Sequence, residues 1–330
     1  MLPIGLETAR SYSSRVSPRP LRLSVTDRCN FRCRYCMPPG GVPKLAHGDV
    51  LSLEEMAVLA AWLAEHVGVQ RIKLTGGEPL VRAGLDELVA HLAAIPGIAE
   101  ISLTTNGSRL SQQAELLKAA GLARVNVSLD SLDAARFHEL TLGGRLEQTL
   151  AGISAAVAAG LVPVKLNSVL QRSSWKRDVP LLLDYAAENG FELRFIELMR
   201  TGTERAWCDA EFVAASEVQR WLCQRETCLP MAATGGGPAR LSTVFWRGSI
   251  VSVGWITPRS HPFCQSCQRL RLDARGRLYR CLMDPQFFDL RPFLREPSNR
   301  AVEQTLQLYL KEKSAPLVMD HPYAMSLIGG

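Results

Sequence analysis

The segment SVTDRCNFRCRYCMPPGG, residues 24–41, places three cysteines within eight residues. Cys29, Cys33 and Cys36 have the spacing C-x3-C-x2-C. A structural zinc site normally has four ligands and disulfides use cysteines in pairs, so a set of three needs another explanation. Closely spaced thiolates hold iron–sulfur clusters, and a four-iron cluster with three protein ligands keeps one iron open. We interpret the segment as a site for such a cluster; the alternative is a zinc site completed by a distant residue such as His47.

A second set of three cysteines lies in FCQSCQRLRLDARGRLYRCL, residues 263–282. Cys264, Cys267 and Cys281 have the spacing C-x2-C-x13-C. Zinc with His261 as fourth ligand is the alternative here. Because two such sets occur in one chain, we predict that each set holds an iron–sulfur cluster with one open iron. The remaining cysteines have no ligand-like spacing and are predicted to be ordinary buried thiols; they are Cys208, Cys223 and Cys228.

The apolar pattern before residue 200 alternates between strand-like and helix-like periods. Strands are predicted at 21–25, 71–75, 100–105, 124–130, 162–169 and 193–198. Helices are predicted at 52–67, where Ser52 and Glu55 form a capping box, and at 84–94, 110–120, 146–159 and 177–189, with a shorter turn at 133–140. Six β–α units in series indicate a parallel sheet with right-handed crossovers. Because a full barrel needs eight units, we expect an α/β fold with an open, partial (β/α)6 TIM-like barrel.

Polar and glycine-rich stretches follow the predicted strands, where such folds carry their chemistry. In chain order these stretches are the first cysteines, 75–79 (TGGEP), 104–107 (TTNG), 128–130 (SLD), Lys165 with Asn167 near the end of the fifth strand, and 197–199 (ELM). We therefore expect one site that is assembled from all six strand ends.

The alternation stops after about residue 200. Residues 201–212 are loop-like, 212–224 are predicted to form a helix, and 233–240 form a glycine-rich linker. Residues 242–248 and 249–256 are predicted to form a strand pair before the second cysteine set. We expect a flexible tail at 1–18, a barrel at 19–200, and a small C-terminal region at 201–330 that carries the second cluster.

Composition limits the function classes. The 330 residues carry a net charge of +6, which suits an anionic small molecule as well as nucleic acid. The chain has no apolar run long enough for a transmembrane helix, and its first residues lack the apolar stretch of a secretory signal. A transit peptide is the alternative to a plain N-terminal tail. Nine cysteines without an export signal favour a reducing, cytoplasmic location.

The C-x3-C-x-aromatic-C spacing after the first strand, with GGEP after the second, resembles radical S-adenosylmethionine enzymes. LRLSVTDRCNFRCRYCMP, LTGGEPL, TTNG, VNVSLD, RFIELM, FCQSCQRLRL, GRLYRCL and the terminal Gly329-Gly330 together resemble the GTP 3′,8-cyclase family, from about residue 18 to the last residue. That family converts GTP to (8S)-3′,8-cyclo-7,8-dihydroguanosine 5′-triphosphate, the first step of molybdenum cofactor biosynthesis.

The resemblance implies two [4Fe-4S] clusters, one on Cys29, Cys33 and Cys36 and one on Cys264, Cys267 and Cys281. It implies S-adenosylmethionine contacts from Tyr35, Gly77, Ser128 and Met199. It implies GTP contacts from Arg22, Lys73, Thr104, Lys165, Arg269, Leu270 and Arg271, with Arg71 and Arg194 as plausible additions. A triphosphate carries about four negative charges, so several converging cations are required. The chain has no P-loop motif that would hold a triphosphate instead.

The mechanism that the resemblance implies begins with a 5′-deoxyadenosyl radical, which takes hydrogen from C3′ of the GTP ribose. The resulting radical adds to C8 of guanine, while the double-glycine terminus reaches into the site. The expected partners are a flavodoxin- or ferredoxin-like electron donor, cyclic pyranopterin monophosphate synthase as the next enzyme, and a second copy in a homodimer.

Two other functions remain open from the residues. Another radical S-adenosylmethionine enzyme with an auxiliary cluster, such as a peptide-modifying one, usually carries more cysteines in its C-terminal region. A metal-dependent nucleic-acid-binding module would show basic patches with interleaved aromatics, whereas aromatic residues are only 7% of this chain.

Overall fold

The computed structural model describes residues 19–201, 204–231, 237–264, 267–296, 300–311, 320–321 and 325. The predicted tail at 1–18 and the terminal Gly329-Gly330 lie outside these residues. Within the described part, no helix has the length and apolar character to cross a membrane.

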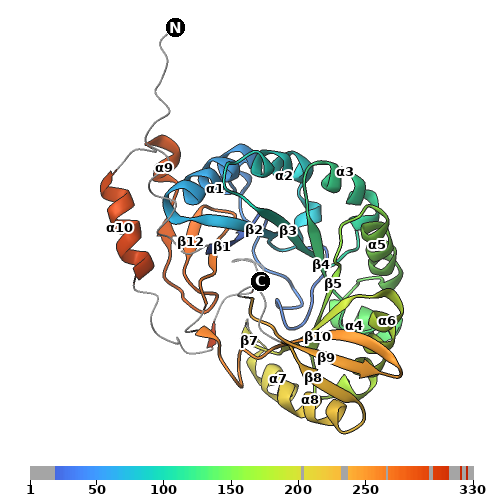
Figure 1. The fold of residues 1–330 in the computed structure, drawn as a ribbon. Coiled ribbons are helices and arrows are strands. Elements are labelled where there is room, and N and C mark those ends of the chain that lie inside the picture. The colour runs from blue at the N-terminus through green and yellow to red at the C-terminus, as the bar shows by residue number, and fades with distance from the viewer. Residues whose placement is uncertain are drawn as a thin grey trace.

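Six parallel strands form the centre of the fold and lie side by side in chain order (Figure 1). They are β1 (Arg19–Ser24), β2 (Val69–Thr75), β3 (Glu100–Thr105), β4 (Arg124–Ser128), β5 (Lys165–Leu170) and β6 (Glu192–Glu197). All six predicted strands are present. The fifth begins three residues later than predicted, at Lys165, because Pro163 has no N–H to donate to a neighbouring strand.

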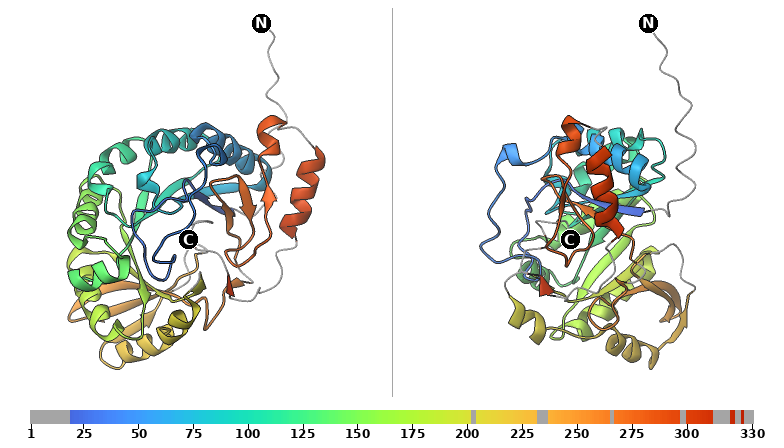
Figure 2. Two further views of the ribbon diagram at one scale, coloured as in Figure 1. Left: turned by 180° about the vertical axis from the view of Figure 1, so that it is seen from behind. Right: turned by 90° about the vertical axis from the view of Figure 1, so that its left-hand side faces the viewer.

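Helices cover the outer face of this curved sheet (Figures 1 and 2). They are α1 (Leu53–Val67), α2 (Leu85–Ala93), α3 (Ala114–Ala119), α4 (Ala134–Thr141), α5 (Leu146–Ala158) and α6 (Trp175–Asn189). The predicted capping box is confirmed, because Ser52 Oγ accepts from Glu55 N (3.1 Å) and the Glu55 carboxylate accepts from Ser52 N (2.7 Å). The helix predicted at 110–120 is interrupted at Gln113, where a 3-10 turn, η3 (Leu110–Gln112), gives way to α3.

The C-terminal region extends the same sheet at both edges. Beyond β6 the sheet continues through β10 (Ser249–Ile256), β9 (Arg240–Trp246) and β8 (Thr227–Pro230). Beyond β1 it continues through β11 (Leu270–Leu272), β12 (Arg277–Tyr279) and β13 (Phe288–Asp289). The predicted strand pair is thus confirmed as β9 and β10, and twelve of the described strands form one sheet that does not close on itself. The fold is therefore a partial barrel, as expected.

Two 3-10 turns, η1 (His47–Asp49) and η2 (Pro79–Val81), lie in the N-terminal half. The remaining elements of the C-terminal half are β7 (Arg200–Thr201), α7 (Arg205–Ala210), α8 (Ala215–Cys223), α9 (Pro292–Arg295), α10 (Arg300–Lys311) and β14 (Asp320–His321). β7 and β14 pair as a separate two-stranded sheet. The loop predicted at 201–212 contains α7, and the helix predicted at 212–224 begins only at Ala215. The domain boundary at residue 200 stays a prediction, because strands from both sides of it share one sheet.

The strand side chains divide between a core and a cavity. Leu21 and Leu23 of β1 and Ile72 and Leu74 of β2 are almost completely buried in the main hydrophobic core. The alternate positions, Arg22 among them, face the interior of the barrel, because successive side chains of a strand point to opposite faces. This alternation turns a row of polar residues toward one cavity.

The prediction for the unassigned cysteines is correct for only one of the three. Cys208 is a buried free thiol. Cys223, at the end of α8, and Cys228, on β8, instead form a disulfide. Cys223 is exposed and Cys228 is half-buried, so neither is an ordinary core thiol.

Candidate active site between two cysteine sets

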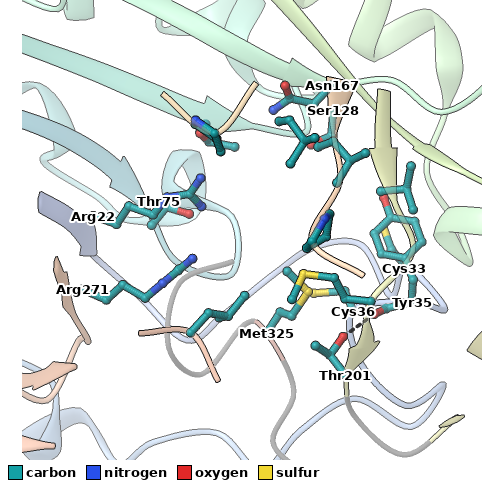
Figure 3. A pocket seen from close by; sticks show the side chains of 18 of the residues that line it. Arg22, Cys33, Tyr35, Cys36, Thr75, Ser128, Asn167, Thr201, Arg271 and Met325 are labelled. Carbon is teal, nitrogen blue, oxygen red and sulfur yellow. Dashed lines mark hydrogen bonds between the residues drawn. The ribbon is translucent and has the colours of Figure 1, made fainter. Parts of the chain in front are cut away.

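A cavity of about 600 Å³ lies at the carboxyl ends of the barrel strands, and both cysteine sets line it. Most of the predicted site residues line it too. These are Cys29, Cys33, Cys36, Cys264, Cys267, Cys281, Tyr35, Gly77, Ser128, Met199, Arg22, Thr104, Arg269 and Arg271. Figure 3 shows Cys33, Tyr35 and Cys36 on one side of this space and the guanidinium groups of Arg22 and Arg271 on the other. Residues from opposite ends of the chain therefore share one site.

The loop of the first cysteines rests on the turn that follows β2. Gly77 N donates to Thr26 O and Glu78 N donates to Arg28 O, both at 2.8 Å. A Cβ atom added at Gly77 would overlap the carbonyl of Arg28. Glycine at this position is thus required by the close approach of the two backbones, apart from any contact with a ligand.

Glu78 connects this turn to the neighbouring strand. Its carboxylate accepts hydrogen bonds from Leu80 N (3.1 Å), Thr105 Oγ1 (2.6 Å) and Asn106 N (2.7 Å). The residue is almost fully buried, and burial raises the pKa of its carboxyl group to about 7. Glu78 therefore holds the ends of β2 and β3 together beneath the first cysteines.

Tyr35 is held in place by Asp130. The Tyr35 hydroxyl donates to Asp130 Oδ2 (2.6 Å), while Val169 N donates to Asp130 Oδ1 (2.8 Å). Burial raises the pKa of the Asp130 carboxyl to about 6, and burial beside this carboxyl raises the pKa of Tyr35. Asp130 belongs to the stretch 128–130 that was predicted for the site, but the sequence assigned it no role of its own.

Two segments from the C-terminal half contact the backbone of the first cysteine loop. Thr201 Oγ1 donates to Tyr35 O (3.1 Å), and Met325 N donates to Cys36 O (3.2 Å). The Met325 side chain lies in the cavity (Figure 3). Sequence reasoning missed Met325, because a methionine near the terminus carries no pattern of its own.

Ser128 and Asn167 lie next to each other, as β4 and β5 pair them in register (Figure 3). Both line the cavity. Asn167 Oδ1 is buried and has no hydrogen-bond partner among the described residues. A buried acceptor without a partner is costly, so this wall of the cavity suits a ligand that carries a hydrogen-bond donor.

The second cysteine set lies beside two arginines. Arg269 Nε donates to Cys267 Sγ (3.3 Å), and its guanidinium stacks over Phe263 at 4.9 Å. Arg271 is nearly buried on β11. Burial raises the pKa of the Cys264 thiol, and it raises the pKa of Cys29 to about 11. The Cys29 and Cys264 thiols are therefore protonated at neutral pH as long as nothing is bound to them.

Cations converge at the base of the cavity. Arg22 and Arg271 occupy paired positions on β1 and β11. The pKa of Arg22 is lowered by burial, then by Arg271, Arg269 and Arg194. Lys73, paired with Arg22 on β2, also has a lowered pKa, because it is buried and lies near Arg22. Within the described part of the chain neither Arg22 nor Lys73 forms an ion pair, so this region favours an anion.

Three predicted contacts do not line the cavity within the described structure. Lys73 is half-buried on β2 beside Arg22, and Leu270 packs in the hydrophobic core with less than 2% of its surface exposed. The placement of Lys165 near the end of its strand is wrong, because Lys165 begins β5 and forms an ion pair with Glu192 (2.7 Å). Glu192 also pairs with Arg194 (2.6 Å). The error came from starting the fifth strand at residue 162, which moved Lys165 toward the wrong end.

Residues 23–186 of the chain match the Radical SAM superfamily, and residues 191–317 match Molybdenum Cofactor Synthesis C. A GTP 3′,8-cyclase of Pelotomaculum thermopropionicum is 46% identical over 84% of this chain and 85% of its own length. A GTP 3′,8-cyclase of Moorella thermoacetica is 44% identical over 94% of this chain and 97% of its own length. The chain therefore belongs to the GTP 3′,8-cyclase family.

The fold is also found among solved structures. Streptococcus suis SuiB, solved with S-adenosylmethionine, matches 84% of this chain and 63% of its own chain with a TM-score of 0.56 and 14% identity. At that identity the likeness extends to the fold alone. It agrees with the open α/β barrel described above.

Proposed function

We propose that the cavity binds S-adenosylmethionine beside the first cysteine set and GTP between the barrel cations and the second set. The chain is a radical S-adenosylmethionine GTP 3′,8-cyclase, which forms (8S)-3′,8-cyclo-7,8-dihydroguanosine 5′-triphosphate in the first step of molybdenum cofactor biosynthesis. One observation carries the assignment of the site. Two sets of three free cysteines face one cavity whose base is cationic.

The cysteines fit two four-iron clusters. Each set offers three free, half-buried thiols to the same space, which leaves one iron of each cluster open toward a ligand. A cluster spreads its thiolates over several irons, whereas zinc gathers them around one point. Among the described residues no three His, Cys, Asp or Glu side chains are grouped to hold one ion. We therefore propose Cys29, Cys33 and Cys36 for the first cluster and Cys264, Cys267 and Cys281 for the second.

Cys29, Cys33 and Cys36 would hold the first cluster, which would supply, once reduced, the electron for cleavage of S-adenosylmethionine to methionine and a 5′-deoxyadenosyl radical. The chain's own groups bind and orient that cofactor. We assign this role to Tyr35, Gly77, Ser128 and Met199, which all line the cavity. Asp130 fixes the Tyr35 side chain, and the unpaired Asn167 Oδ1 is suited to accept from a hydroxyl or amino group of the nucleoside.

GTP would place its triphosphate on the barrel cations and its guanine at the second cluster. Arg22, Arg269 and Arg271 line the cavity and concentrate positive charge there. Lys73 and Arg194 lie close enough to add to this field. We also assign Thr104 and the stretch around Leu270 to GTP, the latter through its backbone because its side chain is in the core. Lys165 would have to leave Glu192 to reach the triphosphate.

The remaining partners are proposed from family membership. They are a flavodoxin- or ferredoxin-like electron donor, transfer of the product to cyclic pyranopterin monophosphate synthase, a cytoplasmic location and a homodimer. We further propose that the Gly329-Gly330 terminus assists in the site. The hydrogen bond of Met325 to Cys36 supports this, because it brings the chain to the cavity five residues before its end.

Reconstitution under anaerobic conditions tests this assignment. The purified chain is loaded with iron and sulfide and then incubated with S-adenosylmethionine, reductant and GTP. We expect about eight irons per chain and formation of 5′-deoxyadenosine that depends on GTP. Binding of zinc in place of iron, or cofactor cleavage that is indifferent to GTP, would contradict the proposal.

A further inference from the structure

Two cysteines of the second set lie in a segment that crosses the open side of the barrel, whereas the third, Cys281, follows β12. The described residues 257–264 and 267–269 lie between β10, which pairs with β6, and β11, which pairs with β1 on the far edge of the parallel strands. Figures 1 and 2 show the two groups of C-terminal strands at separate edges of the sheet. Cys264 and Cys267 belong to this crossing segment. Their position therefore depends on how the segment is attached at its two ends.

Glu197, the last residue of β6, attaches the first end. Its Oε2 accepts from Arg259 N (3.0 Å) and Ser260 N (2.9 Å). Its Oε1 accepts from Ala215 N at the start of α8 (3.0 Å) and from the Ser260 hydroxyl. The side chain is completely buried, so four donors from two separate segments surround one carboxylate away from solvent.

Arg259 reinforces the same attachment. Its guanidinium donates to Asp209 Oδ1 (3.0 Å) and stacks over Phe212 at 4.0 Å. Cys264 follows Ser260 by only four residues, a length of chain that spans at most about 14 Å. Fixing the backbone at 259–260 therefore restricts where Cys264 can lie relative to the cavity.

We propose that Glu197 is a positioning residue for the second cysteine set. Glu197 is also one of the residues that line the cavity. Its carboxylate fixes the start of the crossing segment against the end of β6 and so sets the place at which Cys264 and Cys267 face the cavity. The inference rests on the proposed function, in which these cysteines hold the cluster that contacts guanine.

Glu197→Gln tests the proposal, because the amide turns an NH2 group toward backbone donors that the carboxylate accepted. In iron-free protein we expect a thiol reagent to label Cys264 and Cys267 several-fold faster than in the parent, as read by peptide mass spectrometry. Labelling of the first cysteine set is expected to stay unchanged. After reconstitution we expect about four irons in place of about eight, with loss of the spectroscopic signal of one cluster.

Glu211→Gln is the matched control. Glu211 accepts from Ser173 N (3.0 Å) and Ser173 Oγ (2.8 Å), so it is also a carboxylate that joins two loops, but it does not touch the crossing segment. This variant is expected to label and load like the parent. Ser260→Ala removes one of the four hydrogen bonds to Glu197 and is expected to give a smaller change in labelling and iron content in the same direction as Glu197→Gln. If Glu197→Gln fails to fold, Ser260→Ala tests the role of Glu197.

The presence of the second cluster and the role of Glu197 can be tested separately. If the parent protein takes up only about four irons, the proposed second cluster fails whatever Glu197 does. If the parent takes up about eight and both Glu197→Gln and Ser260→Ala label and load as the parent does, the inference about Glu197 is overturned. Equal acceleration of labelling in both cysteine sets would overturn it too, because the effect would then be a general loosening of the fold.

Discussion

At the scale of single residues, buried polar groups hold the two cysteine segments in place. Glu78 joins the turn beneath the first set to β3, and Glu197 joins the segment of the second set to β6. Both are buried carboxylates that accept hydrogen bonds from several backbone N–H groups. The apolar pattern of the sequence predicts neither of these roles. A carboxylate in this position connects loops that are far apart in the chain, because one group can accept from several segments at once.

Asp130 gives a prediction for the pH dependence of stability. Its pKa is about 6 in the folded protein, above the value near 3.9 of an unfolded chain. Between these values the folded state keeps a proton that the unfolded state has lost, so the free energy of unfolding falls as pH rises from 4 to 6. Asn cannot titrate. In iron-free protein Asp130→Asn should therefore remove part of this fall, on the order of 2 kcal/mol, when urea unfolding is compared at pH 4 and pH 6.5.

Asp133→Asn is the control for this experiment. The pKa of Asp133 is lowered by the hydrogen bond from Arg136 N, so its contribution is present above the pKa of the unfolded chain and is lost as pH falls. Its replacement should not reduce the fall between pH 4 and 6.5. An unchanged pH dependence in Asp130→Asn would show that the Asp130 carboxyl is not shifted as described.

Arg22 tests the anion site at the base of the cavity. Because Arg22 lines the cavity and has no ion pair among the described residues, Arg22→Ala should weaken GTP binding about 10- to 100-fold, the usual range for charge-assisted hydrogen bonds. Isothermal titration with GTP and, separately, with guanosine measures this. Guanosine binding should be affected far less. Arg247→Ala, at an exposed ion pair with Asp184, is the control. Equal losses for GTP and guanosine would place the triphosphate elsewhere.

At the scale of helices and strands, the sequence predicted those features that depend on the local pattern of residues. The six strands of the barrel and the capping box of α1 follow from short apolar runs and from Ser52 and Glu55, which lie three residues apart. The interruption at Gln113 and the short helix α7 were missed, since helices of six residues have too few positions to show a period. Because β5 begins only at Lys165, this residue lies at the start of the strand and not near its end, where it was predicted.

Gly77 gives a prediction at the contact between two loops. Gly77→Ala would drive a methyl group into the carbonyl of Arg28, so the loop of the first cysteines must move away from the turn after β2. After reconstitution we expect loss of the first cluster with the second retained, which is about four irons per chain. Iron analysis together with low-temperature electron paramagnetic resonance distinguishes the two clusters.

Gly40→Ala provides the comparison within the same loop, because a Cβ at Gly40 meets no atom within 4 Å. This variant should load both clusters. If Gly77→Ala also loads both, the close backbone contact does not control the geometry of the first cysteine set.

At the scale of the whole molecule, the sequence could not show how the C-terminal region joins the barrel. The pairing of β10 with β6 and of β11 with β1 brings together residues far apart in the chain, and strand patterns alone do not specify such partners. The family resemblance supplied most of the site residues. Asp130 and Glu197 lie in strand-end stretches that the sequence predicted for the site, but their roles emerged only from the folded structure, because they are contacts between distant segments, and Met325 was not predicted at all.

The joined sheet explains why one cavity serves both cysteine sets. The first set follows β1, the crossing segment carries Cys264 and Cys267 across the open side, and Cys281 follows β12, so the thiols of both sets line the same space. The central claim is that this space holds a radical source against the ribose of GTP. Transfer of the C3′ hydrogen between the two ligands is the event that depends on that arrangement.

Reaction of GTP carrying deuterium at C3′ tests this claim most directly. The reconstituted protein is incubated with S-adenosylmethionine, reductant and the labelled GTP, and 5′-deoxyadenosine is analysed by mass spectrometry. We predict that the 5′-deoxyadenosine contains one deuterium, and that GTP labelled at C2′ gives none. Unlabelled 5′-deoxyadenosine from the C3′-labelled substrate, formed at the same rate with or without GTP, would contradict the account.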